Sequence, residues 1–399
     1  MSSSLDINIV VVGGCGHVGL PLAVALSANG TKVSSYDVNQ SAVSLVNSGV
    51  TPFFENGLEQ LLNQELAAQR FNATTDMSVI GSADIIIVVI GTPVDEHLNP
   101  NPASIRKVLE EIQPFLIDGQ LLILRSTIYP GVTQMVESFL AAGGNDIDVA
   151  FCPERIAEGH ALEELRSLPQ IIGSRTPESR ARAEKLFMRI APSIIHISPE
   201  EAELAKLFTN TWRYIKFAAA NQLFMMANDF GIDFEKVRTA LTQDYPRAAD
   251  MPSPGFAAGP CLLKDTMQLA AFNGNNFTLG HSSMLINEGL PLYLVSRAAL
   301  RFDLSNMTIG ILGMAFKGNS DDTRSSLAYK LKHVLDFKSK KLICADKNVK
   351  TDGSLVSEEQ LLASADLIFI GTPHNHYKSL EINVPVIDIW NLRGDGVKI

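Results

Sequence analysis

The sequence has few cysteines, and their spacing matches neither a disulfide framework nor a metal site. Its 399 residues include four, Cys15, Cys152, Cys261 and Cys344, which are far apart and form no Cys-x-x-Cys pair. Disulfide scaffolds and zinc sites need closely spaced cysteines, so scattered thiols are typical of a reducing compartment. We therefore expect free thiols and no resident metal.

Long apolar runs and an excess of basic residues are also lacking. The longest aliphatic run, residues 85–90, is far too short to span a bilayer. The first residues carry no basic region followed by a cleavage site, as a signal peptide would. The formal net charge of −10 disfavours binding to nucleic acid or to an anionic membrane. We expect a cytoplasmic protein whose anion-binding groups are local.

A glycine-rich turn follows the first predicted strand, residues 7–12, and opens an apolar helix. A G-x-G-x-x-G sequence between a strand and a helix is typical of dinucleotide binding, because the backbone must approach a pyrophosphate closely. The second predicted strand, residues 32–36, ends at an acid suited to the ribose hydroxyls, and no arginine follows it, which favours NAD over NADP. The residues assigned to the cofactor here are Gly14, Gly16, His17, Val18, Gly19 and Asp37.

Two further predicted strands, in 83–93 and 121–131, end in hydroxyl-bearing residues. In open α/β sheets ligands bind beyond the carboxyl ends of the strands, so Thr92, Pro93, Ser126 and Thr127 are predicted to line the cofactor cleft. Taken singly, such hydroxyls usually cap the next helix. The segment 149–159 places two carboxylates, Glu154 and Glu158, beyond another strand.

A long helical segment, residues 199–229, has few helix breakers. Lys206, Asn210 and Arg213 share one of its faces, and a lone lysine there would ordinarily be solvated. The pairing of lysine with asparagine on such an apolar segment instead indicates a site or an interface. We interpret the helix as a spine between two domains, with apolar faces suited to a partner subunit.

The last hundred residues repeat the pattern of the first. Residues 307–318 form a strand and a glycine-containing turn, 341–344 a strand ending near Asp346, and 365–373 nearly repeat 83–93. A repeated succession of elements predicts two Rossmann-like, doubly wound α/β domains joined by a long central helix and a helical dimerisation block. The predicted boundaries are 1–198 for NAD binding, 199–302 for the central helical region and 303–399 for the second nucleotide-binding domain.

Two basic residues in the second copy suit a diphosphate. Lys317 and Arg324 stand beside a predicted strand end. The alternative for each is an ion pair with the neighbouring Asp321 or Asp322. The residues themselves favour neither diphosphate binding nor the ion pair.

The segment 252–266 places Cys261 after a Gly/Pro-rich turn and at the start of an apolar helix. The positive end of the helix dipole is expected to lower the pKa of such a thiol. Lys264 is close by, and Asp265 lies one turn further on the same face. The alternative is a buried cysteine that only packs, which is how we interpret Cys15 and Cys152.

Six motifs, in this order, resemble the UDP-glucose/GDP-mannose dehydrogenase family over nearly the whole chain. They are Gly14-x-Gly16-x-x-Gly19-Leu-Pro, residues 126–131, Pro153-Glu-x-x-x-Glu-Gly159, Glu203-Leu-Ala-Lys-x-x-x-Asn210, Gly259-Pro-Cys-x-x-Lys-Asp265 and Phe316-Lys-x-x-x-Asp-Asp-Thr-Arg324. The resemblance implies a four-electron oxidation of the C6 alcohol of a nucleotide sugar to the carboxylate, with two NAD⁺ used in turn.

Residue roles follow from the same resemblance. Cys261 would be the nucleophile that forms a thiohemiacetal and then a thioester, and Lys206 and Asn210 would stabilise the oxyanions. Asp265 and Thr127 would handle protons through a water, and Glu154 would act as base in thioester hydrolysis. Other predicted substrate contacts are Glu158, Phe256, Gly259, Phe316 and Lys317; predicted cofactor contacts include Glu158, Lys264 and Arg324. Arg247 would reach the substrate of a neighbouring subunit, which implies a homodimer.

The identity of the sugar stays open at this stage. Lys264-Asp265 resembles the UDP-glucose branch more than the Val-Asp of the N-acetylmannosamine branch, so UDP-glucose is the first expectation. UDP-N-acetylhexosamines (ManNAc or GlcNAc), TDP-glucose and GDP-mannose are the alternatives, because Ala258-Gly259-Pro260 departs from the family's usual Gly-Gly-Ser/His before the cysteine. Outside this class, a two-electron β-hydroxyacid-type dehydrogenase or a non-catalytic NAD-binding protein would share the first domain.

Overall fold

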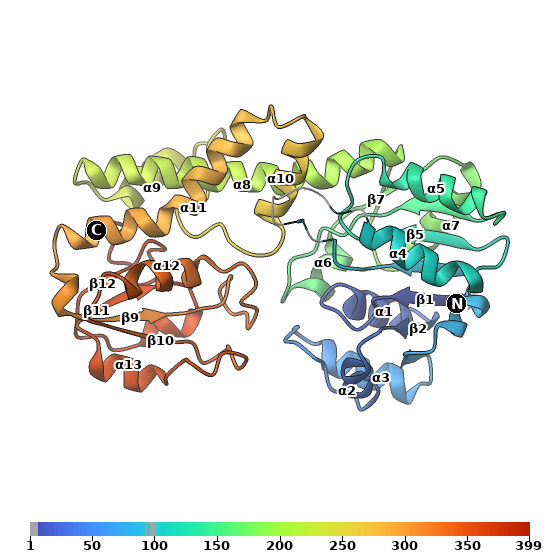
Figure 1. Cartoon of the computed structure of the whole chain (residues 1–399), viewed down its shortest axis with the longest axis horizontal. Coiled ribbons are helices and arrows are strands. Elements are labelled where there is room, and N and C mark those ends of the chain that lie inside the picture. The colour runs from blue at the N-terminus through green and yellow to red at the C-terminus, as the bar shows by residue number, and fades with distance from the viewer. Residues whose placement is uncertain (1–6, 93, 96–100, 102) are drawn as a thin grey trace. The chain divides into compact units, whose positions relative to one another are not determined.

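The computed structural model describes residues 7–92, 94–95, 101 and 103–399. The chain divides into two compact units, Met1–Phe208 and Thr209–Ile399, and each contains its own sheet of mostly or wholly parallel strands (Figure 1). The mixed α/β fold with two sheets and a long helix, predicted above, is thereby confirmed. The finer three-part division stays a prediction.

The sheet of the first unit has the order β3-β2-β1-β4-β5-β6-β7-β8. Its first six strands follow the order of a dinucleotide-binding sheet, with the direction of strand addition reversing between β1 and β4. All neighbours are parallel except β6 and β7, which are antiparallel. The strands are β1 Asn8–Val12, β2 Lys32–Tyr36, β3 Phe71–Thr74, β4 Ile85–Val88, β5 Leu121–Leu124, β6 Asp148–Phe151, β7 Gln170–Ser174 and β8 Ile194–Ile197.

Continuous apolar strands give this unit a core on each face of the sheet. On β1, Ile9 and Val11 pack in one core with α1, whereas Val10 and Val12 pack in the other with α4 and α5. Side chains alternate between the faces of a strand, so an apolar run requires helices on both sides. The helices are α1 Gly19–Ala28, α2 Gln40–Asn47, α3 Leu58–Ala67, α4 Ala103–Ile112, α5 Val132–Ala142, α6 Ala161–Ser167 and α7 Pro177–Phe187.

The sheet of the second unit has the order β10-β9-β11-β12, with all neighbours parallel. This repeats the order β2-β1-β4-β5 of the first unit, as the repeated sequence pattern predicts. The elements are α9 Phe234–Thr242, α10 Leu262–Phe272, α11 Thr278–Ala299, β9 Thr308–Leu312, α12 Leu327–Asp336, β10 Lys341–Ala345, α13 Glu358–Ser364, β11 Leu367–Ile370 and β12 Val386–Ile387.

Helix α8, Pro199–Asp229, begins in the first unit and continues into the second. Its 31 residues coincide with the predicted segment. Pro199 fits the first helical position, where a missing N–H costs nothing. Among the helices of the described residues, none is long and apolar enough to cross a membrane.

Candidate active site

The turn between β1 and α1 has the shape of a dinucleotide cradle. A methyl group on Gly14 would lie 2.6 Å from the Ser35 side chain, and one on Gly19 would lie 2.3 Å from the Gly13 carbonyl oxygen. One on Gly16 would meet nothing nearer than that same oxygen, at 3.7 Å. Gly14 and Gly19 therefore permit the tight packing of strand, turn and helix, while Gly16 leaves its outer side open. This is the space that a pyrophosphate needs at a helix N-terminus, so these residues fit NAD.

The predicted ribose-binding acid lies beside this turn. Asp37 directly follows β2 and its carboxylate accepts hydrogen bonds from the backbone N–H groups of Cys15, at 3.1 Å, and Asn39, at 3.0 Å. The side chain remains half-buried, which leaves lone pairs for ribose hydroxyls. His17 in the same turn stacks on Phe53 with ring centroids 4.1 Å apart, and Val18 is the N-cap of α1.

The hydroxyls beyond β4 and β5 tie the two strand ends together. The Ile90 N–H donates to Ser126 Oγ at 2.8 Å, and Thr92 Oγ1 donates to the Thr127 carbonyl oxygen at 2.6 Å. The Ser126 hydroxyl therefore has a structural role, because it satisfies a backbone N–H group beyond the neighbouring strand. Pro93 lies outside the described residues. The cofactor and proton-handling roles of these residues stay predictions.

A buried arginine holds Glu154, and sequence reasoning did not single it out. Arg125 is 1% exposed and forms an ion pair with Glu154 Oε2. Its other terminal nitrogen donates to the Cys152 carbonyl and to Gln170 Oε1, both at 3.0 Å. Glu154 Oε1 accepts from the Arg155 and Ile156 N–H groups at 2.7 and 3.0 Å. Both oxygens are thus held in place, which orients the carboxylate that we predict to be a base.

Helix α8 is anchored by Glu203, one turn before Lys206. Glu203 is 1% exposed and accepts from the Gly131 N–H at 2.6 Å, the Thr133 N–H at 2.8 Å and Thr133 Oγ1 at 2.6 Å. A carboxylate at this place caps the positive N-terminus of α5. The anchor sets the position of Lys206, which is 8% exposed, relative to the 126–131 segment. Glu203 belongs to a motif recognised in the sequence, but its contacts with Gly131 and Thr133 were not predicted.

In the second unit, Cys261 is the N-cap of α10, as predicted, and is the exposed cysteine. The other three are buried. Burial raises the pKa of Cys15 and of Cys152 to about 12 and that of Cys344 to about 11. These three are protonated, inert thiols at neutral pH. The packing role predicted for Cys15 and Cys152 agrees with this burial.

Asp265 and Asn210 form a buried pair one helical turn from Cys261. Asp265 is 0% exposed, and its Oδ2 accepts from Asn210 Nδ2 at 2.5 Å. Lys264 Nζ lies 3.4 Å from Asp265 Oδ1, and the Asp265 N–H donates to the Cys261 carbonyl at 2.8 Å. Three of the predicted residues, from α8 and α10, are thereby brought together.

The loop before Cys261 is held at two glycines. The buried Asn221 of α8 accepts from the Gly255 N–H at 2.8 Å and donates to its carbonyl at 3.0 Å. Gly259 has φ +99°, and a methyl group there would lie 2.6 Å from the Phe316 ring. Gly259 therefore permits the close approach of the loop to Phe316, a predicted substrate residue. Asn221 was not recognised in the sequence, because nothing local marks its partner.

The remaining predicted residues of the second unit lie on loops. Phe256 packs edge-on against Trp390 with centroids 6.0 Å apart. Lys317 follows Phe316 in the turn after β9. Arg324 pairs with Asp322 at 2.5 Å, which is the ion pair considered above as its alternative. Arg247 is exposed on the loop after α9, with its guanidinium 6.0 Å from the Tyr245 ring centroid.

The sheet order, the open glycine turn and the acid after β2 define an α/β protein with a site for NAD. Comparison with known families identifies it further. The chain matches the UDP-glucose/GDP-mannose dehydrogenase family in its NAD binding domain over residues 7–191, its central domain over 200–288 and its UDP binding domain over 310–393. The chain belongs to this family and is an NAD-dependent nucleotide-sugar dehydrogenase.

Individual relatives carry different sugars in their names. The chain is 29% identical to the UDP-N-acetyl-D-mannosamine dehydrogenase of Pyrococcus horikoshii, covering 93% of this chain and 90% of the relative. It is 27% identical to the NDP-N-acetyl-D-galactosaminuronic acid dehydrogenase of Ralstonia nicotianae, over 94% and 93%. Among solved structures, the UDP-glucose dehydrogenase of Pyrobaculum islandicum superposes with a TM-score of 0.89 at 25% identity, over 100% of this chain and 98% of that chain.

Proposed function

We propose that this protein oxidises the C6 alcohol of a UDP-linked hexose to the uronic acid in two NAD-dependent steps, the second of them on a sugar bound covalently to Cys261. The observation that carries the proposal is the exposed thiol at the N-cap of α10, with the buried Asp265–Asn210 pair one turn away. A two-electron β-hydroxyacid dehydrogenase would need neither this thiol nor the UDP-binding domain. A non-catalytic NAD-binding protein would not need the thiol and the carboxylate side by side.

The proposed reaction balances with two NAD⁺ and one water per sugar. Bound NAD⁺ would supply the acceptor for each hydride. The first oxidation takes the alcohol to the aldehyde and releases one proton. The Cys261 thiolate adds to the aldehyde carbon, and the resulting thiohemiacetal loses the second hydride to become a thioester. Water then cleaves the carbon–sulfur bond, so the carboxylate leaves and the thiol is regenerated.

The protein's own groups take distinct parts in this proposal. Asp265, held by Asn210, accepts protons through a water shared with Thr127. Lys206 and Asn210 stabilise the oxygen that becomes negative when sulfur adds to the aldehyde. Glu154, oriented by Arg125, activates the water that hydrolyses the thioester. Glu158, Phe256, Gly259, Phe316 and Lys317 bind the nucleotide sugar, whereas Lys264 and Arg324 contact the cofactor.

Two sugars are supported by different observations. The Lys264–Asp265 pair supports UDP-glucose, as the sequence motif predicts. The names of the Pyrococcus horikoshii relative and of a solved structure from Staphylococcus aureus, both UDP-N-acetyl-D-mannosamine dehydrogenases, support the N-acetylated sugar. The loop before Cys261 lines the proposed sugar site, and its departure from the usual family pattern is compatible with either.

An NADH-release assay over a panel of nucleotide sugars tests the proposal. We expect two NADH per sugar consumed, and kcat/KM for one UDP-hexose at least about 100-fold above that for GDP-mannose, because a site built for one base rejects others strongly. UDP-glucose, UDP-N-acetyl-D-mannosamine and UDP-N-acetyl-D-glucosamine distinguish the candidate sugars, and TDP-glucose tests the base. A ratio of one NADH per sugar would contradict the four-electron reaction.

The functional unit proposed here is a homodimer built on α8. Trp212, Leu223, Met226 and Phe230 are 57%, 41%, 61% and 83% exposed. At 3.6 residues per turn they lie within roughly 60° of one another on the helix and its end. A large exposed apolar stripe of this kind marks an interaction surface. A second copy of the chain would cover it and would bring the exposed Arg247 to a neighbouring substrate.

We expect a mass in solution of twice 43.3 kDa. Met226→Lys should shift the protein towards the monomer, because it places a charge in the centre of the stripe. The same variant should raise KM for the nucleotide sugar more than KM for NAD, since Arg247 is proposed to act on the neighbour's sugar site. Lys236→Met, on exposed α9 surface, is a control for a changed lysine count. Wild-type protein that stays a monomer at micromolar concentration would contradict the proposal.

A further inference from the structure

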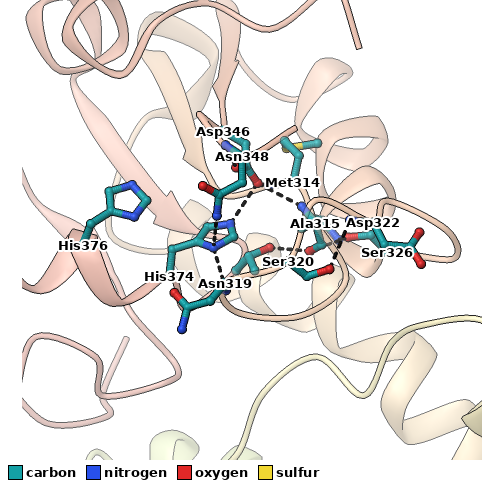
Figure 2. A network of polar contacts seen from close by, with 12 residues as sticks. Met314, Ala315, Asn319, Ser320, Asp322, Ser326, Asp346, Asn348, His374 and His376 are labelled. Atoms are coloured by element: carbon teal, nitrogen blue, oxygen red, sulfur yellow. Dashed lines mark hydrogen bonds and ion pairs between the residues drawn. The ribbon is translucent and has the colours of Figure 1, made fainter. Parts of the chain in front are cut away.

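We propose that His374 and Asp346 form a buried lock that positions the turn 313–319, and with it Phe316 and Lys317, for binding the UDP-sugar. The inference rests on the proposed function and names two positioning residues for the same site. His374 follows β11, Asp346 follows β10 and the turn follows β9, so the lock joins the carboxyl ends of three neighbouring strands (Figure 2).

Asp346 holds the first half of the turn. Its Oδ2 accepts from the N–H groups of Met314, at 2.7 Å, and Ala315, at 3.0 Å, and from His374 Nε2 at 3.0 Å. The side chains of Asp346 and His374 are both 0% exposed. Burial tends to raise the pKa of this carboxyl group, but the hydrogen bonds from His374 and the two backbone amides outweigh it, so the pKa of Asp346 lies below its usual range. Asp346 is therefore ionised at neutral pH.

His374 holds the second half. Its Nδ1 accepts from the Asn319 N–H at 2.9 Å and faces Asn348 Nδ2 at 3.0 Å, as Figure 2 shows. Because Nδ1 receives donors, the ring proton is assigned to Nε2, where it is donated to Asp346. Asn319 has φ +58°, and its Oδ1 accepts from the Asn375 N–H at 3.0 Å. The turn is thus tied at both ends to one histidine–aspartate pair.

The turn after β9 differs from the equivalent dinucleotide-binding turn after β1 in the first unit. Asp37 and Asp346 stand directly after equivalent strands, and each accepts from the equivalent turn residue, Cys15 or Ala315. In the second copy, however, Phe316 stands where the first has Gly16, and Asp346 is 4% exposed whereas Asp37 is half-buried. The second turn therefore has no open glycine for a pyrophosphate and no acid available to a ribose. In the second unit, the contact between Asp346 and the turn instead holds a loop that carries the side chains of Phe316 and Lys317.

The lock also bears on the cysteine loop. Phe316, in the locked turn, lies against Gly259, two residues before Cys261, so closely that a methyl group on Gly259 would overlap its ring. The Gly259 N–H donates to the Ser325 carbonyl at 3.2 Å. A shift of the turn would move the wall against which the Cys261 loop packs, as well as Lys317.

Two substitutions of His374 separate the two halves of the lock. Glutamine can place its Nε2 near the ring Nε2 and keep the bond to Asp346 while losing the acceptor for Asn319. Asparagine can place its Oδ1 near the ring Nδ1 and keep that acceptor while losing the donor to Asp346. We measure UDP binding by calorimetry, KM for the best nucleotide sugar, KM for NAD, and Tm. His333→Gln, an exposed histidine of α12, is the matched control.

We expect His374→Gln to weaken UDP binding and raise KM for the nucleotide sugar about tenfold, the effect of one well-placed hydrogen bond, with KM for NAD unchanged. His374→Asn should change UDP affinity by no more than about threefold, because Asp346 would still hold the first half of the turn through the Met314 and Ala315 N–H groups, and His333→Gln should not change it. If His374→Gln does not fold, Thr372→Val tests whether UDP binding depends on another hydrogen bond to the same turn, because Thr372 Oγ1 donates to the Ala315 carbonyl at 2.5 Å.

Other outcomes overturn the proposal. A folded His374→Gln protein with wild-type UDP affinity would show that the turn needs no lock. Equal losses in the glutamine and asparagine variants would indicate packing of a buried ring rather than a directed hydrogen bond. Wild-type protein that binds UDP but oxidises no nucleotide sugar would contradict the proposed function alone, whereas wild-type protein that does not bind UDP would contradict both.

Discussion

Replacing Cys261 with serine is expected to lower kcat for NADH production at least about 10⁴-fold. The hydroxyl of serine is a far weaker nucleophile than a thiolate near neutral pH, so the aldehyde would not be captured and the second oxidation would not occur. Cys261 is exposed at a helix N-cap, so the substitution leaves no buried cavity. NAD affinity and Tm should stay at wild-type values.

The matched control removes a thiol elsewhere. Cys344→Ala deletes a buried, protonated cysteine of β10 and should keep kcat within about twofold of wild type, since it takes no part in the proposed chemistry. Iodoacetamide at neutral pH should label the wild-type protein at one position and the Cys261→Ser protein at none, because only thiolates react rapidly. A Cys261→Ser protein that still yields two NADH per sugar would refute the covalent route.

Asp265→Asn is expected to lower kcat by about 10² to 10⁴-fold, the range typical of a lost general acid–base group. The amide has nearly the same shape but cannot accept a proton from the water that serves the reacting alcohol. In the wild-type protein Asp265 is fully buried, accepts a hydrogen bond from Asn210 Nδ2 and forms an ion pair with Lys264 Nζ. The new amide would lose the ion pair with Lys264 and could present its own donor to Asn210, so a loss of about 1–3 kcal/mol in stability accompanies the catalytic effect.

Activity and stability are separated by measuring both on the same protein. Tm by calorimetry and NAD affinity report whether the variant is folded at the assay temperature. Asp336→Asn, an exposed acid at the end of α12, makes the same change in charge and should leave kcat within about twofold. If folded Asp265→Asn protein retains kcat within about threefold of wild type, Asp265 is not the proton-handling group.

The elements that carry the fold were recoverable from local patterns. Strand β2, Lys32–Tyr36, and helix α8, Pro199–Asp229, coincide with the predicted segments, because each is bounded by residues that stop or start an element. The glycine turn after β1 was equally plain, since its spacing is dictated by covalent geometry. Strands β7 and β8 were not predicted. The antiparallel pairing of β6 with β7 depends on a chain reversal that no short motif marks.

The hydrogen-bond and ion-pair partners of the predicted site residues could not be predicted from local patterns. Glu203 was part of a recognised motif, yet its use as a cap for α5 involves residues seventy positions earlier in the chain. Arg125 follows an apolar strand in the sequence, and only folding brings it into an ion pair with Glu154. Asn221 and His374 lie in segments without a recognised motif, and each binds backbone groups of a distant loop.

Local motifs were enough to predict the cofactor and, through their resemblance to a known family, the class of protein and the cysteine that we propose as nucleophile. Those features depend on residues within one turn or one strand–helix junction, where the covalent chain sets the geometry. Which groups orient them was settled by folding, as Arg125 for Glu154 and His374 for the Phe316–Lys317 turn illustrate. A hydrogen bond between distant segments exists only once packing has brought them within about 3 Å, and the order of residues along the chain does not encode that distance directly.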